Sequence, residues 1–178
     1  MTIFLSGGAK NGKSSLAQNL AVRLAGDGAL YYVATMIPVD DEDRQRIRRH
    51  VADRAGMGFE TIECGRHILD VLDSADRNGT FLLDSVTALL MNEMFAGSHI
   101  DKQAGERCAS DLAAFIRSVN NAVIVSDAIY SDAERYDEIT ELYRASLAMA
   151  DRACAAECDT VIEMVAGQPI IYKGGLPE

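Results

Sequence analysis

A short stretch near the start of the chain combines glycines, a lysine and a serine in a spacing that binds phosphate. Residues 7 to 14 read GGAKNGKS and fit the pattern G-x-x-x-x-G-K-[ST], between an apolar run and a helical pattern that begins at Leu16. In such a loop the backbone N–H groups and the helix N-terminus converge on phosphate oxygens. Lys13 would reach the β- and γ-phosphates, and the Ser14 hydroxyl would ligate Mg²⁺. The alternative is a glycine-rich turn that only caps a helix, which the full pattern and its flanking elements disfavour.

The loop therefore predicts that the protein binds a nucleoside triphosphate with Mg²⁺, and ATP and GTP both remain open. We expect the nucleotide contacts of this region to come from the loop and the start of its helix, namely Gly7, Gly8, Ala9, Lys10, Asn11, Gly12, Lys13, Ser14 and Ser15.

An acidic residue at the end of a later apolar run is the second component of a triphosphate site. The run Phe81-Leu82-Leu83-Asp84 ends just before a helical pattern from Val86 to Met94. A carboxylate in that place would ligate Mg²⁺ directly or through water. Asp84 could equally cap the helix, because aspartate is favoured at helix N-termini, and the two roles can coexist. We take Asp84 as a candidate catalytic and metal-binding residue.

Basic residues gather in one segment of an otherwise acidic chain. The segment from Asp40 to Arg54 reads DDEDRQRIRRHVADR and holds five of the 17 Lys and Arg residues. Acids in the first turn and bases further on also suit a solvated helix, because they complement the helix dipole. His50 lies among these arginines, and a neutral imidazole is a competent nucleophile toward phosphorus. We therefore regard His50 as a candidate nucleophile and the arginines as candidate phosphate contacts.

The elements that must position these residues alternate along the chain. Runs rich in β-branched and aromatic residues predict strands at residues 2–5, 29–35, 59–62, 80–83, 122–126, 160–165 and 169–172. Most segments between them carry apolar residues at three- and four-residue spacing, which is typical of amphipathic helices. The alternation predicts an α/β fold, with a mainly parallel sheet covered on both faces and a C-terminal antiparallel hairpin. We expect residues 1–178 to form a single domain.

Composition restricts the partners of the protein. The 178 residues carry a net charge of −10, which opposes nonspecific binding of nucleic acid or of an anionic membrane. The sequence has no run long and apolar enough for a membrane span, and the N-terminus reaches the glycine loop too early for a signal peptide. We expect a cytoplasmic protein with a small-molecule substrate. Its four cysteines lack C-x-x-C spacing and are interpreted as reduced thiols that pack in the core.

Four stretches together resemble one known family over nearly the whole chain. They are SGGAKNGKS from Ser6, YYVAT followed by DDEDRQRIRRHVADR, FLLDSVTALLMN up to Asn92, and CDTVIEMVAGQPIIYKG from Cys158. The chain resembles the bifunctional adenosylcobinamide kinase / adenosylcobinamide-phosphate guanylyltransferase family of cobalamin biosynthesis. The second stretch discriminates best, because a tyrosine-rich strand followed by an acidic turn, arginines and His50 is rare, whereas glycine loops of this kind are widespread.

The resemblance implies a P-loop, RecA-like fold, usually assembled as a trimer, and a chemistry in two steps. A triphosphate held by the loop would phosphorylate the aminopropanol hydroxyl of adenosylcobinamide. GTP would then give its guanylyl group to His50 with loss of pyrophosphate, and the phosphorylated product would displace the histidine. The resemblance gives catalytic roles to Lys13 and Asp84 beside His50. It adds nucleotide contacts at Thr35, Arg46, Arg49, Arg54 and Glu63.

The chain departs from the family pattern at several places. Some members carry His-His where this chain has Arg49-His50, so that the nucleophile could be a neighbour of His50, and Ala55 and Phe59 replace Pro and Trp. After residues 123–125 the family continues with Asn-Glu-Val-Gly, whereas this chain has Ser126-Asp127-Ala128-Ile129. Further on, Asp151 and Arg152 stand where Asn-Gln is usual. Whether Asp127 or Asp132 replaces the missing glutamate is open, since either could also cap a helix that begins near Ala133.

Two other functions remain as alternatives. The first is another small-molecule P-loop kinase with no covalent step, and the second is a non-catalytic regulator in which bound nucleotide shifts a conformational balance. The kinase alternative gives no reason for the cluster of arginines around His50, and the acidic surface and the lack of a separate interaction domain count against the regulator.

Overall fold

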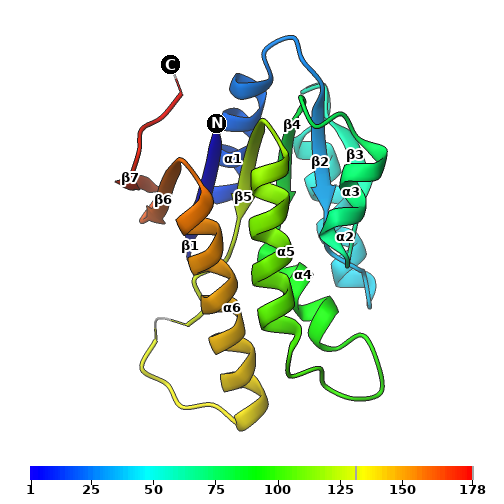
Figure 1. The fold of residues 1–178 in the computed structure, drawn as a ribbon, viewed down its shortest axis with the longest axis vertical. Helices are drawn as coiled ribbons and strands as arrows, with labels where there is room; N and C mark the ends of the chain where they lie inside the picture. Colours follow the sequence, from blue (N-terminus) through cyan, green and yellow to red (C-terminus); the bar gives the residue numbers. More distant parts are fainter. Residues whose placement is uncertain (131, 178) are drawn as a thin grey trace.

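Strands and helices alternate along the computed structural model, which describes residues 1–130 and 132–177 (Figure 1). Ser131, within the first departing segment, and Glu178 lie outside the described residues. The strands are β1 (Thr2–Gly7), β2 (Leu30–Ala34), β3 (Glu60–Glu63), β4 (Thr80–Asp84), β5 (Asn121–Val125), β6 (Thr160–Val165) and β7 (Gln168–Lys173). Every strand predicted from the sequence is present, and its ends differ from the prediction by at most two residues.

The order of the strands in their sheet decides which loops meet. The order is β3-β2-β4-β5-β1-β6-β7. The pairs from β3 to β6 are parallel, and β7 pairs antiparallel with β6, so the predicted sheet and hairpin are confirmed. Because β5 lies between β1 and β4, the chain after β5 leaves the sheet between the glycine loop and Asp84.

Helices cover both faces of the sheet. Figure 1 shows α5 and α6 in front of the sheet and α1 behind it. The helices are α1 (Lys13–Ala25), α2 (Asp41–Asp53), α3 (Val71–Ser74), α4 (Val86–Met94), α5 (Ala104–Ser118) and α6 (Glu138–Glu157), with a 3₁₀ turn at η1 (Ile68–Asp70). Among the residues that the structure describes, every helix is too short or too polar to cross a bilayer. Helix α2 differs from the longer helices because it buries none of its residues.

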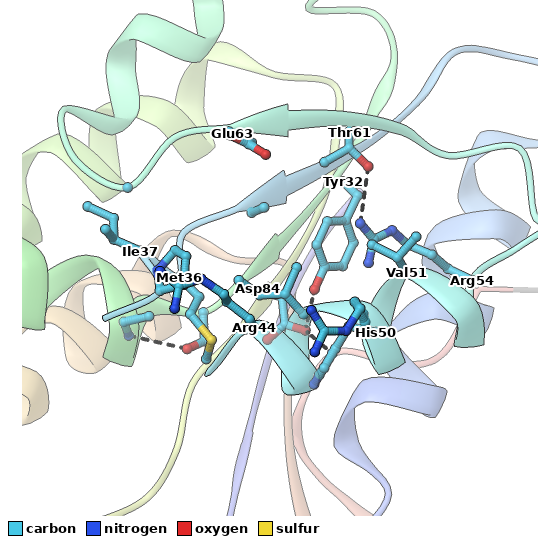
Figure 2. Close-up of a pocket in the computed structure, with 17 residues that line it drawn as sticks. Tyr32, Met36, Ile37, Arg44, His50, Val51, Arg54, Thr61, Glu63 and Asp84 are labelled. Carbon is cyan, nitrogen blue, oxygen red and sulfur yellow. Dashed lines mark hydrogen bonds and ion pairs between the residues drawn. The ribbon is translucent and has the colours of Figure 1, made fainter. Parts of the chain in front are cut away.

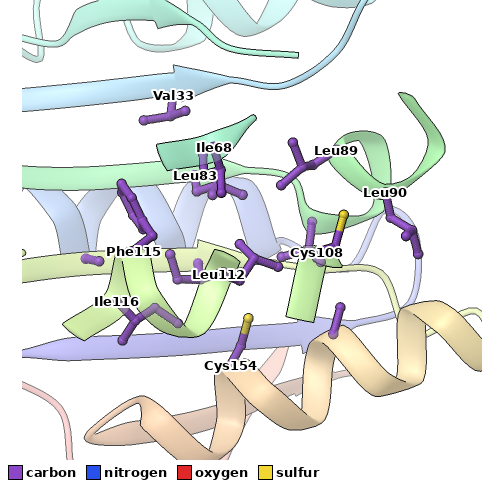
Figure 3. Close-up of a cluster of buried hydrophobic side chains, with 14 of the residues drawn as sticks. Val33, Ile68, Leu83, Leu89, Leu90, Cys108, Leu112, Phe115, Ile116 and Cys154 are labelled. Carbon is purple, nitrogen blue, oxygen red and sulfur yellow. The ribbon is translucent and has the colours of Figure 1, made fainter. Parts of the chain in front are cut away.

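The larger part of the hydrophobic core lies between the sheet and helices α4, α5 and α6 (Figure 3). Leu112 and Phe115 of α5 are fully buried, and the Phe115 ring meets the edge of Phe81 with 5.5 Å between ring centroids. The four cysteines are buried thiols without disulfides, as expected. Cys108 and Cys154 belong to this core (Figure 3), where a thiol packs as a small apolar group. Because Phe81 is the second residue of β4, its contact with Phe115 packs α5 against the amino end of that strand.

Helix α6 begins later than the sequence suggested. It starts at Glu138, and the Asp137 carboxylate caps it by accepting hydrogen bonds from the backbone N–H groups of Ile139 and Thr140. The expected start near Ala133 is therefore wrong. Asp132 does not cap the helix but pairs with Arg144, with 2.8 Å between Oδ1 and the guanidinium nitrogen.

Helix α6 also buries a carboxylate. The Asp151 side chain is 3% exposed and accepts a hydrogen bond from the Tyr130 hydroxyl at 2.9 Å. Its Oδ1 atom and the Ser126 Oγ atom are buried without a hydrogen-bond partner among the described residues. Burial raises the pKa of Asp151 from 3.8 to about 6. A neutral amide at this position would remove the cost of burying the charge.

We expect the Asp151→Asn variant to be more stable than the wild type at neutral pH. Because the folded-state pKa is raised, the wild type loses stability as pH rises from about 4 to about 6 and stays at that lower level above it. The variant lacks this loss, so its free energy of unfolding should exceed that of the wild type by about 3 kcal/mol at neutral pH and by little near pH 4. Urea unfolding at several pH values measures the difference. The exposed Asp27 gives the control Asp27→Asn, and a gain that does not depend on pH would contradict the explanation.

Candidate functional site

The glycine loop leaves β1 in a conformation that its glycines permit. Gly7 has a φ of 143°, and a Cβ atom there would lie 2.6 Å from the Met164 carbonyl oxygen of β6. Gly12 has a φ of 90°, which favours glycine just before α1 begins. Asn11 fastens the loop to β6, because its Nδ2 donates a hydrogen bond to the same Met164 carbonyl at 2.6 Å. The loop is thus held between β1, β6 and the start of α1, where its N–H groups can meet phosphate.

The loop lysine is held from two directions. Lys13 is buried, and its ammonium group donates a hydrogen bond to the Gly8 carbonyl at 2.6 Å. It also lies 3.0 Å from the Asp127 Oδ1 atom, which follows β5. Of the two acids left open by the sequence, Asp127 therefore reaches the phosphate loop, whereas Asp132 is paired with Arg144. The strand order accounts for this, since β5 adjoins β1.

Asp84 lies at the end of β4 between the glycine loop and helix α2. Its Oδ2 atom accepts a hydrogen bond from the Tyr32 hydroxyl at 2.9 Å and lies 3.8 Å from His50 Nδ1. Burial raises the pKa of the Asp84 carboxyl, and the nearby charge of Asp127 adds to this effect. Helix α4 is capped by the Ser85 side chain, which accepts from the backbone N–H of Ala88. Asp84 is therefore free of the capping role and available to a ligand.

A cavity of about 820 Å³ opens between α2 and the carboxyl ends of β2, β3 and β4 (Figure 2). Helix α2 lines it with His50 and with the arginines Arg44 and Arg48. Asp84 lies opposite, and Figure 2 shows it between Tyr32 and His50. The His50 side chain is about one-third exposed, at 32%. The cavity is thus lined by an imidazole, by cationic side chains and by a carboxylate.

Arg54 is fixed at the far end of this cavity. It is buried, its guanidinium carbon lies 3.8 Å from the centroid of the Tyr32 ring, and it donates a hydrogen bond to the Thr61 hydroxyl at 3.1 Å. Glu63, at the end of β3, also lines the cavity (Figure 2). Stacking on a ring and a hydrogen bond leave an arginine little freedom, so Arg54 offers a pre-positioned positive charge.

The structure separates the arginines of the basic segment into two groups. Arg44, Arg48 and Arg54 line the cavity, whereas Arg46 and Arg49 do not; the four arginines of α2 are all exposed, and Arg54 is buried. Arg46 instead approaches Glu42, at 3.9 Å. The charge pattern had made every arginine of the segment a candidate phosphate contact, but the contacts taken from the family resemblance did not include Arg44 and Arg48. The pair Ile47 and Val51 could have indicated which face of α2 turns toward the cavity, since apolar residues at i and i+4 mark the inward face of a helix.

Thr35 is not exposed to the cavity but shapes it. Its side chain is fully buried, and its hydroxyl both donates to the Ser85 carbonyl at 2.8 Å and accepts from the Ser85 N–H at 2.7 Å. The Asn92 side chain donates to the carbonyls of Thr35 and Gly65. These bonds join the ends of β2, β3 and β4. They fix the backbone next to Asp84. Asn92 makes two of these bonds, and Tyr32 donates a hydrogen bond to Asp84 itself, so both residues support the site although the sequence interpretation did not include them.

Ser14 and Asp84 provide the donor types that Mg²⁺ takes in proteins. A hydroxyl and a carboxylate supply hard oxygen ligands, and Mg²⁺ fills its other positions with water and phosphate oxygens. Within the described residues, no cluster of three or more His, Cys, Asp or Glu side chains forms a metal site made of protein alone. The side chains present therefore fit a magnesium ion that arrives with a nucleotide.

The glycine loop between β1 and α1, with a carboxylate at the end of β4, defines a P-loop nucleotide-binding protein of the RecA-like type. The chain shares this fold with a solved ATPase domain, with a TM-score of 0.57 at 10% identity over 99% of this chain and 78% of that one. The KaiC-like protein PH0186 from Pyrococcus horikoshii OT3 gives a TM-score of 0.52 at 11% identity, over 97% and 78% of the two chains. The chain belongs to the cobinamide kinase / cobinamide phosphate guanyltransferase family, whose model matches residues 3–171.

Two curated relatives agree with this assignment over nearly their whole length. The bifunctional adenosylcobalamin biosynthesis protein CobU of Salmonella typhimurium is 31% identical over 97% of this chain and 100% of that protein. CobP of Pseudomonas aeruginosa, which carries the same description, is 29% identical over 98% of each chain. The resemblance found in the sequence is confirmed, and the protein is an enzyme of the cobinamide kinase and guanyltransferase family.

Proposed function

We propose that the protein phosphorylates the aminopropanol hydroxyl of adenosylcobinamide and then transfers GMP from GTP to the product through a guanylyl-His50 intermediate. The observation that carries this proposal is the placement of His50 beside Asp84, in an arginine-lined cavity whose Asp84 carboxylate also lies close enough to Lys13 of the glycine loop to respond to its charge. A simple kinase needs the loop and Asp84 but has no use for a histidine surrounded by cations.

In the first step the loop binds the triphosphate. Its backbone N–H groups hold the phosphate oxygens. Lys13 breaks its ion pair with Asp127 and contacts the β- and γ-phosphates instead. Ser14 and Asp84 would hold Mg²⁺, which neutralises charge on the phosphates when bound. The loop therefore supplies position and positive charge, which are the main protein contributions to phosphoryl transfer.

In the second step His50 attacks the α-phosphorus of GTP, a nitrogen–phosphorus bond forms, and pyrophosphate leaves. The phosphate of adenosylcobinamide phosphate then attacks the same phosphorus and His50 leaves. The proximity of His50 Nδ1 to Asp84 favours the tautomer that keeps the proton on Nδ1 and presents Nε2 to phosphorus. Arg44, Arg48 and Arg54 would offset the charge of the two polyanions.

The two half-reactions can be tested separately on the purified protein. With Mg²⁺ and GTP labelled on the α-phosphate, the denatured protein should retain label in an acid-labile, base-stable form. With adenosylcobinamide and ATP or GTP, mass spectrometry should detect the phosphate ester, and GTP should then convert it to the GDP derivative. Phosphorylation without protein label would favour a plain kinase, and nucleotide binding without either product would favour a regulator.

Two neighbouring arginines of α2, Arg48 at the cavity and Arg49 outside it, provide a matched pair of substitutions that tests the second step. We expect Arg48→Ala to raise the KM for GTP in protein labelling by about 10- to 100-fold, roughly the loss of one charge-assisted hydrogen bond. Arg49→Ala, its sequence neighbour outside the cavity, should change that KM by less than about threefold. Equal effects of the two substitutions would contradict the assignment of the inward face.

We further propose that residues 1–178 act as one domain in the cytoplasm, where nucleoside triphosphates are available, and assemble as a homotrimer. The trimer is expected from the family resemblance. Sedimentation equilibrium would yield three times the mass of one chain if it forms.

A further inference from the structure

Asp127 is fixed at the phosphate loop by its own backbone as well as by its side chain. Its N–H donates to the Thr87 hydroxyl at 3.0 Å, and the N–H of the next residue, Ala128, donates to the Gly7 carbonyl at 3.1 Å. The segment after β5 is thus bonded to the glycine loop on one side and to the start of α4 on the other. These bonds fix the backbone of Asp127 beside the loop, within reach of Lys13.

Three carboxylates lie in this part of the molecule, but their surroundings differ. Asp151 is 3% exposed and bonded to the Tyr130 hydroxyl. Asp84 accepts from Tyr32 and faces His50. The Asp127 side chain is 37% exposed, and Lys13 is the side-chain contact recorded for its carboxylate within the described residues. Asp127 is therefore the most exposed of the three carboxylates and the one that lies directly against the loop lysine.

Binding of a triphosphate changes the surroundings of Asp127. The ammonium group that now lies 3.0 Å away is the group that must contact the β- and γ-phosphates. Once Lys13 has moved to them, the carboxylate loses its counter-charge and is left close to the phosphates that Lys13 now contacts, where it can accept a proton from an attacking hydroxyl.

We propose that Asp127 is the general base of the kinase step, an inference that rests on the proposed function. The acceptor hydroxyl oxygen attacks the γ-phosphorus and forms the new ester bond. The bond from the γ-phosphorus to the β,γ-bridging oxygen breaks, and the nucleoside diphosphate leaves. The hydroxyl proton passes to the Asp127 carboxylate, which returns it to solvent after the product departs. Lys13 couples the two events, because the same movement that binds the phosphates uncovers the base.

The Asp127→Asn variant tests this role, because it keeps the shape of the side chain and removes its ability to take a proton. We expect kcat for phosphorylation of adenosylcobinamide to fall about 100-fold, with the KM for the triphosphate changed by less than about threefold. Guanylylation of the protein by GTP involves no acceptor hydroxyl and should stay within about threefold of the wild type. Asp132→Asn, on the same segment but paired with Arg144, is the matched control.

A second variant distinguishes loss of the base from loss of the fold. Asp127→Ala should regain at least about tenfold in phosphorylation rate when formate is added, since a small carboxylate can take the proton in the space left by the side chain, whereas formamide should not restore it. Phosphorylation by Asp127→Asn within about threefold of the wild type would overturn the role of Asp127. An equal loss of phosphorylation and of protein labelling would also overturn it, because Asp127 would then only hold Lys13. A wild type that never phosphorylates adenosylcobinamide would instead overturn the proposed function, and this role with it.

Discussion

The Lys13→Ala variant is expected to lose at least about 1000-fold in the rate of phosphorylation of adenosylcobinamide. Lys13 is the buried cation of the glycine loop, and it has the Gly8 carbonyl and Asp127 as partners. Its removal takes away the charge that balances the β- and γ-phosphates. Steady-state rates at saturating acceptor, together with the affinity for a fluorescent triphosphate, measure the loss.

The fold of this variant should survive. The carboxylate that loses its partner, Asp127, is 37% exposed and can be solvated. Arg23, an exposed cation on the same helix, gives the control Arg23→Ala, which should stay within about twofold of the wild type. A Lys13→Ala variant that retained more than about a tenth of the activity would show that the loop does not hold the reacting phosphates.

The His50→Ala variant is expected to abolish labelling of the protein by GTP while leaving phosphorylation of adenosylcobinamide largely intact. No other group can replace a covalent nucleophile, so label should fall by at least about 1000-fold. The kinase step uses the loop, Lys13 and Asp84, and its rate should change by less than about fivefold. Quantifying acid-labile label and phosphate ester in the same samples separates the two effects.

His99→Ala is the matched control, because His99 is an exposed histidine outside the cavity. It should label like the wild type. Label retained in His50→Ala would move the nucleophile to another residue, and loss of both reactions would assign His50 a structural part in the triphosphate site.

The fold could be predicted from the sequence because its signals are local. Each strand is a short apolar run, and each predicted strand is found within two residues of its expected ends. The start of α6 could not be predicted in the same way. Several acidic residues that could cap the helix precede it. In the structure Asp132 pairs with Arg144 and Asp137 is the N-cap, and this ion pair between distant residues is not visible in the sequence.

The site was predictable where one motif contains all its parts, as in the loop from Gly7 to Ser14. The site was less predictable on α2, where the charge pattern left every arginine a candidate and the family resemblance pointed to Arg46 and Arg49. The structure places Arg44 and Arg48 at the cavity instead, because helical spacing and not sequence distance decides what shares a face. The pairing of Lys13 with Asp127 depends on β5 lying beside β1, which no local pattern contains.

Asp84 belongs to both parts of the site, because it lines the cavity beside His50 and, although burial raises its pKa, the positive charge of Lys13 in the glycine loop favours its ionised form. A ligand that alters the charge around this carboxylate at the loop therefore alters the free energy of whatever occupies the cavity. Reciprocity then requires a ligand in the cavity to change the triphosphate dissociation constant by the same factor. Asp84 thus offers the loop and the cavity a route for this coupling within one subunit.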